Sequence, residues 1–194
     1  MSAASESGSH VCPWWLAYTF DNPLRRLVHP PERILAGYVA PGMTVLHIGC
    51  GFGHFSIGMA RLVSDSGCVI ALDVQPQMIV KTVGRARRKG VAHIIRPHLS
   101  DGRDLGVQDR IDFVLASNVL HEVDNLPALI DQVAHRLKPA GFFYIMEPAG
   151  HVRDNRFEKE VDMCISRGLV LSARPRVLRE RCAVLQKPED PTEI

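Results

Sequence analysis

Short apolar runs that are rich in strand-forming residues alternate with helix-forming segments along most of this chain, and only brief turns separate them. The first unit has an apolar run over residues 43–48 and helical spacing over 55–63, and the second has a run over 67–72 and a proline-started helix over 76–89. The other expected elements are a helix over 30–39, strands over 91–96, 111–116 and 142–146, and helices over 125–137 and 155–167. Strand–helix alternation with short connections predicts a mostly parallel sheet with helices on both faces.

The C-terminal segment breaks this alternation. Residues 169–186 read as two strands in succession, and consecutive strands without a helix between them form an antiparallel pair. A length of 194 residues fits one α/β domain and is too short for two of full size. We therefore expect one α/β domain over residues 31–187, with a doubly wound seven-stranded sheet that is mostly parallel and ends in an antiparallel pair. Residues 1–30 would form a tail with an aromatic lid segment, and residues 188–194 a second tail.

Composition excludes several classes of function. The 23 basic and 21 acidic residues leave a net charge of +2, which gives no electrostatic case for a dedicated nucleic-acid binder. The five cysteines include no C-x-x-C pair, and His10 with Cys12 offers too few ligands for a metal. The first ten residues do not resemble a signal peptide, and no apolar stretch approaches the ~20 residues of a membrane helix. We therefore expect a cytoplasmic protein with reduced thiols, no metal site and no membrane span.

A glycine-rich turn follows the first expected strand. Gly49, Gly51 and Gly53 occupy alternate positions between that strand and the helix after it. Glycine lets the backbone approach a ligand closely, and the start of a helix offers free N–H groups. The spacing G-x-G-x-G differs from the G-x-G-x-x-G/A of dinucleotide-binding loops, and no Gly-Lys-Ser/Thr follows as in a P-loop. The turn therefore predicts a ligand loop of another kind.

An acidic residue, Asp73, ends the second expected strand. A carboxylate at the carboxyl end of the neighbouring strand can accept hydrogen bonds from both hydroxyls of a ribose. Asp73 is separated from the glycine loop by the number of residues that one strand–helix–strand unit needs. The loop and Asp73 together predict a nucleoside-binding edge of the sheet.

With these residues the sequence resembles the class I S-adenosylmethionine-dependent methyltransferases, which have a Rossmann-like fold, and most closely the group that includes the quinone-biosynthesis C-methyltransferases. The resemblance covers roughly residues 31–187. Its motifs are V-L-H-I-G-C-G-F-G over 45–53, A-L-D-V-Q-P-Q-M over 71–78, I-D-F-V-L-A-S-N-V-L-H-E-V over 111–123 and L-K-P-A-G-F-F-Y-I-M-E-P over 137–148. It implies an enzyme that transfers the methyl group of S-adenosylmethionine to a small-molecule acceptor.

The resemblance also implies roles for individual residues. Residues of the glycine loop would hold the methionine part of the cofactor, Asp73 its ribose, and later residues its adenine or the closing side of the site. The implied cofactor-binding residues are His47, Gly49, Cys50, Gly51, Gly53, Asp73, Val74, Met78, Ser100, Asp101, Ser117, Asn118 and Val119. One of them departs from the family, which usually has Asp or Glu where this chain has His47. A neutral imidazole accepts a hydrogen bond but brings no negative charge to the cofactor's ammonium group, so we expect weaker or pH-dependent binding.

Methyl transfer from a sulfonium is an in-line displacement that depends mainly on alignment, and a carbon or oxygen acceptor also needs a base. The candidate catalytic residues are His121 and Glu147, which follow the expected fourth and fifth strands at the rim where parallel sheets bind ligands. Trp15, Tyr18 and Glu122 are candidate acceptor contacts, and His151 is a weaker one. For His121 the alternative is a packing residue at a helix start, and for Trp15 and Tyr18 an aromatic segment that packs on the core.

The sequence bears on three other functions. The segment S-N-V-L over 117–120 lacks the Asn/Asp-Pro-Pro-aromatic sequence of enzymes that methylate nucleobase amino groups. A nicotinamide-dependent oxidoreductase could use the same sheet, but the spacing of the glycine loop disfavours it. A catalytically inactive S-adenosylmethionine-binding or interaction module stays open because of His47.

Overall fold

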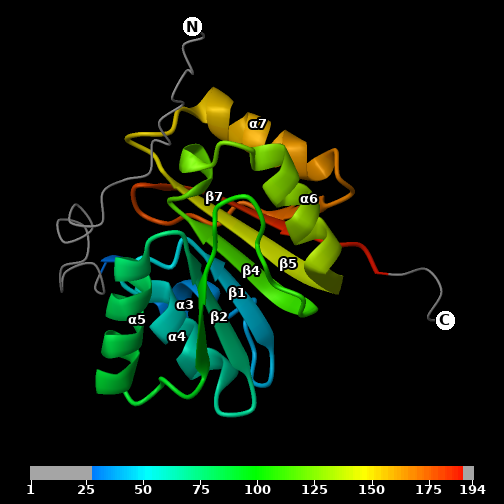
Figure 1. Cartoon of the computed structure of the whole chain (residues 1–194). Helices are drawn as coiled ribbons and strands as arrows, with labels where there is room; N and C mark the ends of the chain where they lie inside the picture. The colour runs from blue at the N-terminus through cyan, green and yellow to red at the C-terminus, as the bar shows by residue number, and fades with distance from the viewer. Residues whose placement is uncertain (1–27, 190–194) are drawn as a thin grey trace, which may run out of the picture.

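The computed structural model describes residues 28–189, in which helices and strands alternate as Figure 1 shows. The helices are α3 (Pro31–Leu35), α4 (His54–Val63), α5 (Pro76–Arg88), α6 (Leu126–Arg136) and α7 (Asp154–Ile165), with a short 3₁₀ turn η2 (Leu120–Glu122). The strands are β1 (Thr44–Ile48), β2 (Cys68–Asp73), β3 (Ile95–Leu99), β4 (Ile111–Ser117), β5 (Leu137–Pro148), β6 (Val170–Ala173) and β7 (Glu180–Gln186).

The strands form one seven-stranded sheet in the order β3-β2-β1-β4-β5-β7-β6. Strands β1 to β5 pair in parallel, whereas β7 is antiparallel to both β5 and β6. The expected fold, a doubly wound and mostly parallel sheet with a C-terminal antiparallel pair, is confirmed. The strand order reverses at β1 and β4, and ligands of such sheets bind beyond the carboxyl ends of the strands at that point.

Helices cover both faces of the sheet, with α3, α4 and α5 on one side and α6 and α7 on the other (Figure 1). Because successive strand residues point to opposite faces, β1 contributes Leu46 and Ile48 to the core under α6 and α7, and Val45 to the core under α3 to α5. Strand β5 divides in the same way, with Phe143 facing the first core and Tyr144 the second. The apolar strands thus read as nearly continuous runs because both of their faces are buried.

Three expected elements have different bounds in the structure. Helix α3 ends at Leu35 rather than near Val39, because the chain continues as a turn in which the carbonyl of Leu35 accepts from the N–H groups of Tyr38 and Val39. Strand β3 begins at Ile95, since the apolar residues before it close the end of α5, with the N–H of Val91 donating to the carbonyl of Ala86.

Strand β5 begins earlier than expected. It starts at Leu137, which pairs with Ile111, although Pro139 and Gly141 read as a stop in the sequence. The structure accommodates this sequence as an irregularity of the strand, because Ala140 takes a φ of +60° and the register to β4 shifts between Ile111 and Phe113.

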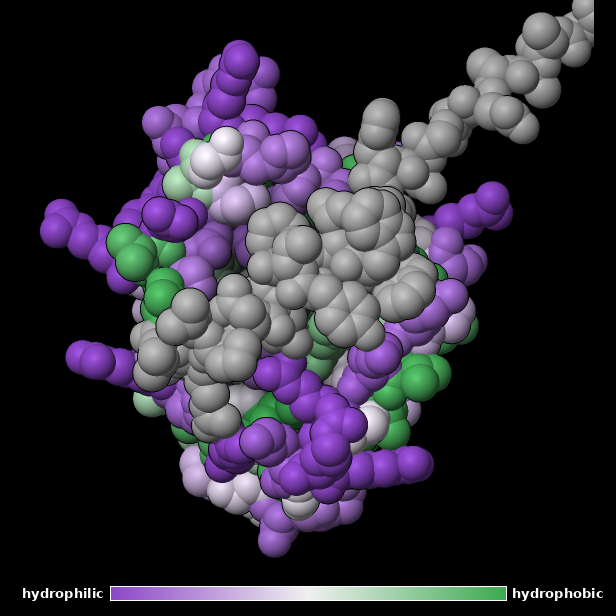
Figure 2. Space-filling view, turned by 90° about the vertical axis from the view of Figure 1, so that its left-hand side faces the viewer, coloured by the Kyte–Doolittle hydropathy of each residue, from purple (hydrophilic) through white to green (hydrophobic). Residues whose placement is uncertain are grey.

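The surface that Figure 2 shows is mostly hydrophilic, and hydrophobic side chains appear there in small separate groups. Within residues 28–189, no helix has the length and apolar character that a membrane crossing needs.

Candidate active site

The glycine loop connects β1 to α4 at the carboxyl edge of the sheet. Gly49, Gly51 and Gly53 have φ angles of +69°, +52° and +77°, in the left-handed region that side-chain-bearing residues rarely adopt. A Cβ on Gly49 would lie 2.7 Å from Cγ2 of Val119, whereas a Cβ on Gly51 would meet nothing within 4 Å. The loop is therefore packed at its start and open at its middle, where a ligand can approach the backbone.

Asp73 joins the end of β2 to this loop. Its side chain is only 6% exposed, its Oδ2 accepts from the N–H of Gly51 at 2.9 Å, and its Oδ1 accepts from the N–H of Gln75 at 3.0 Å. Burial raises the pKa of Asp73, against the lowering effect of these hydrogen bonds. A carboxylate has about four lone-pair sites, so two backbone donors leave capacity for ligand hydroxyls.

Helix α5 contacts the glycine loop through Thr82, a residue that was not among the candidates expected from the sequence. Thr82 is fully buried, donates from Oγ1 to the carbonyl of Gly51 at 2.7 Å, and lies 3.7 Å from Sγ of Cys50. A Cβ on Gly53 would meet its Cγ2 at 2.9 Å. The sequence did contain a signal for Thr82. It is the one residue with a hydroxyl group in the buried stripe of α5 that it shares with Met78 and Ala86.

His47 lies on β1 just before the loop and is buried, with 2% of its side chain exposed. Its Nδ1 shares a hydrogen bond of 2.7 Å with Oγ of Ser56 in α4, and its ring meets Phe55 edge-on at 6.2 Å. Ser56, in the first turn of α4, thus holds the imidazole of His47 in place.

The other residues expected around an adenosyl group lie beyond β2 and β3. Val74 is exposed and Met78 is buried in the first turn of α5. Ser100 and Asp101 follow β3 and organise the next turn, since Oγ of Ser100 donates to the carbonyl of Asp104 at 2.6 Å and Oδ1 of Asp101 accepts from the N–H of Arg103 at 2.9 Å.

The chain leaves β4 through Ser117, Asn118 and Val119. Asn118 has a φ of +57°, and its N–H donates to the carbonyl of Met146 in β5 at 2.7 Å. Within residues 28–189, the hydroxyl of Ser117 and the side-chain oxygen of Asn118 are buried and have no hydrogen-bond partner. Buried polar atoms without partners, beside the glycine loop, are what a polar ligand would satisfy.

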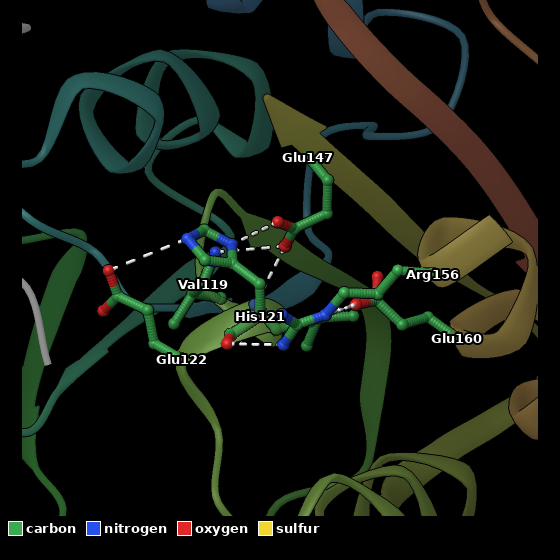
Figure 3. Close-up of polar contacts among 7 residues, drawn as sticks. Val119, His121, Glu122, Glu147, Arg156 and Glu160 are labelled. Carbon is green, nitrogen blue, oxygen red and sulfur yellow. Dashed lines mark hydrogen bonds and ion pairs between the residues drawn. The ribbon is translucent and has the colours of Figure 1, made fainter. Parts of the chain in front are cut away.

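His121 and Glu147 come together beside this turn, as Figure 3 shows. Glu147 is fully buried, its Oε1 accepts from the N–H groups of Val119 and Leu120 at 3.2 and 2.9 Å, and its Oε2 accepts from Nδ1 of His121. Because a carboxylate only accepts, Nδ1 carries the proton, and in the neutral ring Nε2 holds the free lone pair. The same carboxylate thus orients the imidazole and holds the turn whose Val119 packs on Gly49.

Charges around His121 favour its protonation. Burial has the largest single effect and lowers its pKa, but the hydrogen bond and charge of Glu147, together with Glu122, outweigh it and raise the pKa of His121 above its ordinary value. Oε1 of Glu122 lies 3.8 Å from Nε2, on the opposite side of the ring from Glu147 (Figure 3). The ring of His151 meets that of His121 edge-on, with centroids 5.0 Å apart.

Two further residues of this cluster, Arg156 and Glu160, were not selected from the sequence. Both lie on α7, and Nη2 of Arg156 donates to the carbonyl of His121 at 2.6 Å. Glu160 shares the buried stripe of α7 with Phe157, Val161 and Cys164. An acidic residue on an apolar stripe was the available signal, because a buried carboxylate needs a partner.

Within residues 28–189, no group of three or more His, Cys, Asp or Glu side chains could hold a metal ion. Trp15 and Tyr18, the expected acceptor-side aromatics, lie outside the described residues.

The sheet order, the glycine loop after β1 and the acid that ends β2 define the architecture of a class I methyltransferase domain. The sequence matches the family described as "Methyltransferase domain" over residues 40–187, and the chain belongs to that family. The expected methyltransferase domain is thus confirmed.

The chain is similar to methyltransferases whose names give different acceptors. Ribosomal protein L11 methyltransferase of Pelotomaculum thermopropionicum is 34% identical over 112 residues, which cover 56% of this chain and 33% of that protein. Ubiquinone biosynthesis O-methyltransferase of Xanthomonas campestris pv. campestris is 30% identical over 135 residues, 68% of this chain and 54% of that protein. The crystal structure of a SAM-dependent methyltransferase from Aquifex aeolicus has a TM-score of 0.78 at 20% identity and covers 91% of this chain and 98% of its own. The chain spans between a third and about half of the length of these curated relatives.

Proposed function

We propose that this protein binds S-adenosylmethionine at the carboxyl edge of β1, β2 and β4 and transfers its methyl group to a small molecule that carries an ionisable hydroxyl group. The observation that carries this proposal is the pair formed by His121 and the buried Glu147, which places an oriented imidazole next to the turn that packs on the glycine loop.

The residues at the carboxyl edge of β1, β2 and β4 fit S-adenosylmethionine. The open middle of the loop at Gly51 admits the methionine part, and the side-chain oxygen of Asn118 and the hydroxyl of Ser117 are buried atoms that can meet its polar groups. Asp73 keeps acceptor capacity for the ribose hydroxyls, and the exposed Val74 offers an apolar surface to the adenine. Met78, Ser100 and Asp101 complete the adenine side of the proposed site. When bound, the cofactor supplies a methyl group on a sulfonium centre.

His121 would act as the general base. With Nδ1 donating to Glu147, a neutral imidazole presents Nε2 to the hydroxyl of an acceptor and takes its proton as the oxygen attacks the methyl carbon. Glu147 is then a positioning residue, because it fixes the tautomer and the orientation of the ring. Glu122, on the Nε2 side, is the proposed acceptor contact among the described residues, and Trp15 and Tyr18 are proposed contacts from the N-terminal segment.

By their names, one relative acts on a ribosomal protein and another in the biosynthesis of ubiquinone. The small molecule is favoured here because a hydroxyl acceptor uses the base that the His121–Glu147 pair provides. A phenol or quinol ring, as in quinone biosynthesis, fits this chemistry.

The test uses S-adenosylmethionine with a radiolabelled methyl group and three sets of acceptors: phenols and quinols, small amines, and a ribosomal protein preparation. We expect label in the phenol set. His121→Gln should lose about 10²–10⁴-fold in rate while it still binds S-adenosylhomocysteine. His93→Gln, which alters an exposed histidine paired with Asp65, is the matched control. Label only in ribosomal protein, or full activity of His121→Gln, would refute the proposal.

A catalytically inactive S-adenosylmethionine-binding or interaction module is the second candidate, because His47 replaces an acid and shares a hydrogen bond with Ser56. His47→Asp would restore a negative charge at that position. Absence of turnover with every acceptor set, together with tight S-adenosylhomocysteine binding, would favour this second candidate.

A further inference from the structure

Arg156 links α7 to the turn that carries the proposed base. Its Nη2 donates to the main-chain carbonyl of His121 at 2.6 Å, and its Nε lies 3.5 Å from Oε1 of Glu160, one helical turn further along α7. Figure 3 shows the guanidinium between the His121 carbonyl and Glu160. A planar guanidinium held at two points is restrained in orientation as well as position.

The buried position of Glu160 explains why Arg156 is held there. Only 3% of Glu160 is exposed, and among the described residues Arg156 is the only cation within ion-pair distance of its carboxylate. A buried carboxylate is costly without a charged partner. Arg156 therefore bridges Glu160 and the His121 turn, while 55% of its side chain remains exposed.

The groups that face His121 come from four parts of the chain. Glu147 lies on β5, Glu122 on η2, Arg156 and Glu160 on α7, and the ring of His151 on the segment after β5. Three of these groups are carboxyl groups, and Arg156 is the only permanent cation among them. The carboxylates favour an imidazolium ring, which cannot accept a proton, whereas the charge of Arg156 opposes it.

We propose that Arg156 is a positioning residue for His121, which holds the His121 turn against α7 and favours the neutral imidazole that can accept a proton. Glu160 is the buried carboxyl group that, once ionised, keeps Arg156 in place. This inference rests on the proposed function, in which His121 is the base.

The experiment measures His121 directly and requires no acceptor. Histidine ring resonances of the full-length, isotope-labelled protein are titrated by NMR, and the His121 signal is assigned by its loss in His121→Gln. In Arg156→Gln, the loss of a nearby positive charge should raise the pKa of His121 by about 0.5 to 1. Arg156→Lys keeps the charge and should leave that pKa close to wild type.

A second variant moves the same signal in the opposite direction. Glu160→Gln removes the negative charge that Glu160 gains as it ionises at about pH 7, so the pKa of His121 should fall. The control is Glu158→Gln on the same helix, which alters an exposed ion pair with Arg174 and should leave the His121 titration unchanged. A purely structural role of Arg156 predicts no such opposite shifts. An unchanged titration in folded Arg156→Gln, or a rise in Glu160→Gln, would overturn the inference.

A rate measurement separates this inference from the proposed function. With the phenolic acceptor that takes up most label, the acid limb of the pH–rate profile of Arg156→Gln should move to higher pH by the same amount as the His121 titration. If the titration moves and the profile does not, His121 is not the base, yet the control of its charge by Arg156 stands. If the titration is unchanged while His121→Gln is inactive, the inference about Arg156 is wrong and the proposed base stands.

Discussion

Gly49 and Val119 are in direct contact across the carboxyl edge of the sheet, so close that a methyl group on Gly49 would lie 2.7 Å from Cγ2 of Val119. The N–H of Val119 in turn donates to Glu147, whose other oxygen accepts from His121. This contact joins the proposed cofactor loop to the proposed base. The distance between the two sites is therefore set by packing as well as by the sheet.

Gly49→Ala should consequently affect both stability and cofactor binding. The new Cβ would collide with Val119 in a backbone conformation of φ +69°, and we expect a loss of roughly 2–4 kcal/mol in the free energy of unfolding. The matched control is Gly90→Ala at the end of α5, where φ is +73° but a Cβ meets nothing within 4 Å, so that strain alone should cost about 1 kcal/mol. Denaturant unfolding and calorimetric titration with S-adenosylhomocysteine measure both effects, and equal losses in the two variants would contradict this account.

Asp73→Asn tests the ribose contact. The amide has the shape of the carboxylate, but its nitrogen cannot accept from the N–H of Gly51 or Gln75, and the charge that would receive two hydroxyls is lost. We expect affinity for S-adenosylhomocysteine to fall about ten- to hundred-fold. Asp65→Asn, at an exposed aspartate paired with His93, should bind like wild type. Unchanged affinity in Asp73→Asn would refute the proposed ribose contact.

Much of the fold could be predicted because its strands are buried on both faces and its helices begin with clear signals. Pro76 starts α5 and Asn125 caps α6, where its Oδ1 accepts from the N–H of Ala128. The error at β3 occurred where apolar residues do not form a strand. Val91 and Ile94 are buried because they close the turn after α5, and a short apolar run cannot distinguish that role from a strand.

The sequence indicated the candidate residues that follow strand ends, but not the ones that reach the site from a helix face. His121 and Glu147 were both expected at the rim, and the structure brings them into contact. The contact of Arg156 with the His121 carbonyl spans 35 residues and depends on how α7 crosses the sheet, which no local pattern indicates. Thr82 also acts from a helix, since its hydroxyl donates to the glycine loop from α5, although its place in the apolar stripe of that helix was a signal.

Cys50 lies within the glycine loop, but its thiol should be unreactive. It is buried, and burial raises its pKa well above the ordinary range, as burial raises the pKa of Cys164 and Cys182 to about 12. Since the thiolate is the reactive form, alkylation of the native protein should modify Cys68, which is partly exposed, before these three. Peptide mass spectrometry after brief iodoacetamide treatment gives the order, with urea-unfolded protein as the control. Early labelling of Cys50 would show that the loop opens.

The cluster around His121 should also make stability depend on pH. Burial, with help from the charge of Glu147, raises the pKa of Glu160 to about 7 against the opposing effects of Arg156 and His121. An unfolded glutamate titrates near 4.3, so at intermediate pH the folded state keeps a proton that the unfolded chain has released. The stability that this proton provides is present at low pH and is lost as pH rises to about 7. His121 acts in the same direction, because its folded pKa is also raised.

Glu160→Gln should therefore weaken the fall in stability between about pH 5 and about pH 8, because the amide does not titrate. Thermal unfolding of wild type and variant across this pH range measures the difference in stability between them. Groups that are the same in both proteins cancel in this difference. The exposed Glu158→Gln should follow the wild-type curve. If Glu160→Gln falls as steeply as wild type, Glu160 is already ionised in the folded protein at acid pH, and Arg156 stabilises its charge more strongly than burial opposes it.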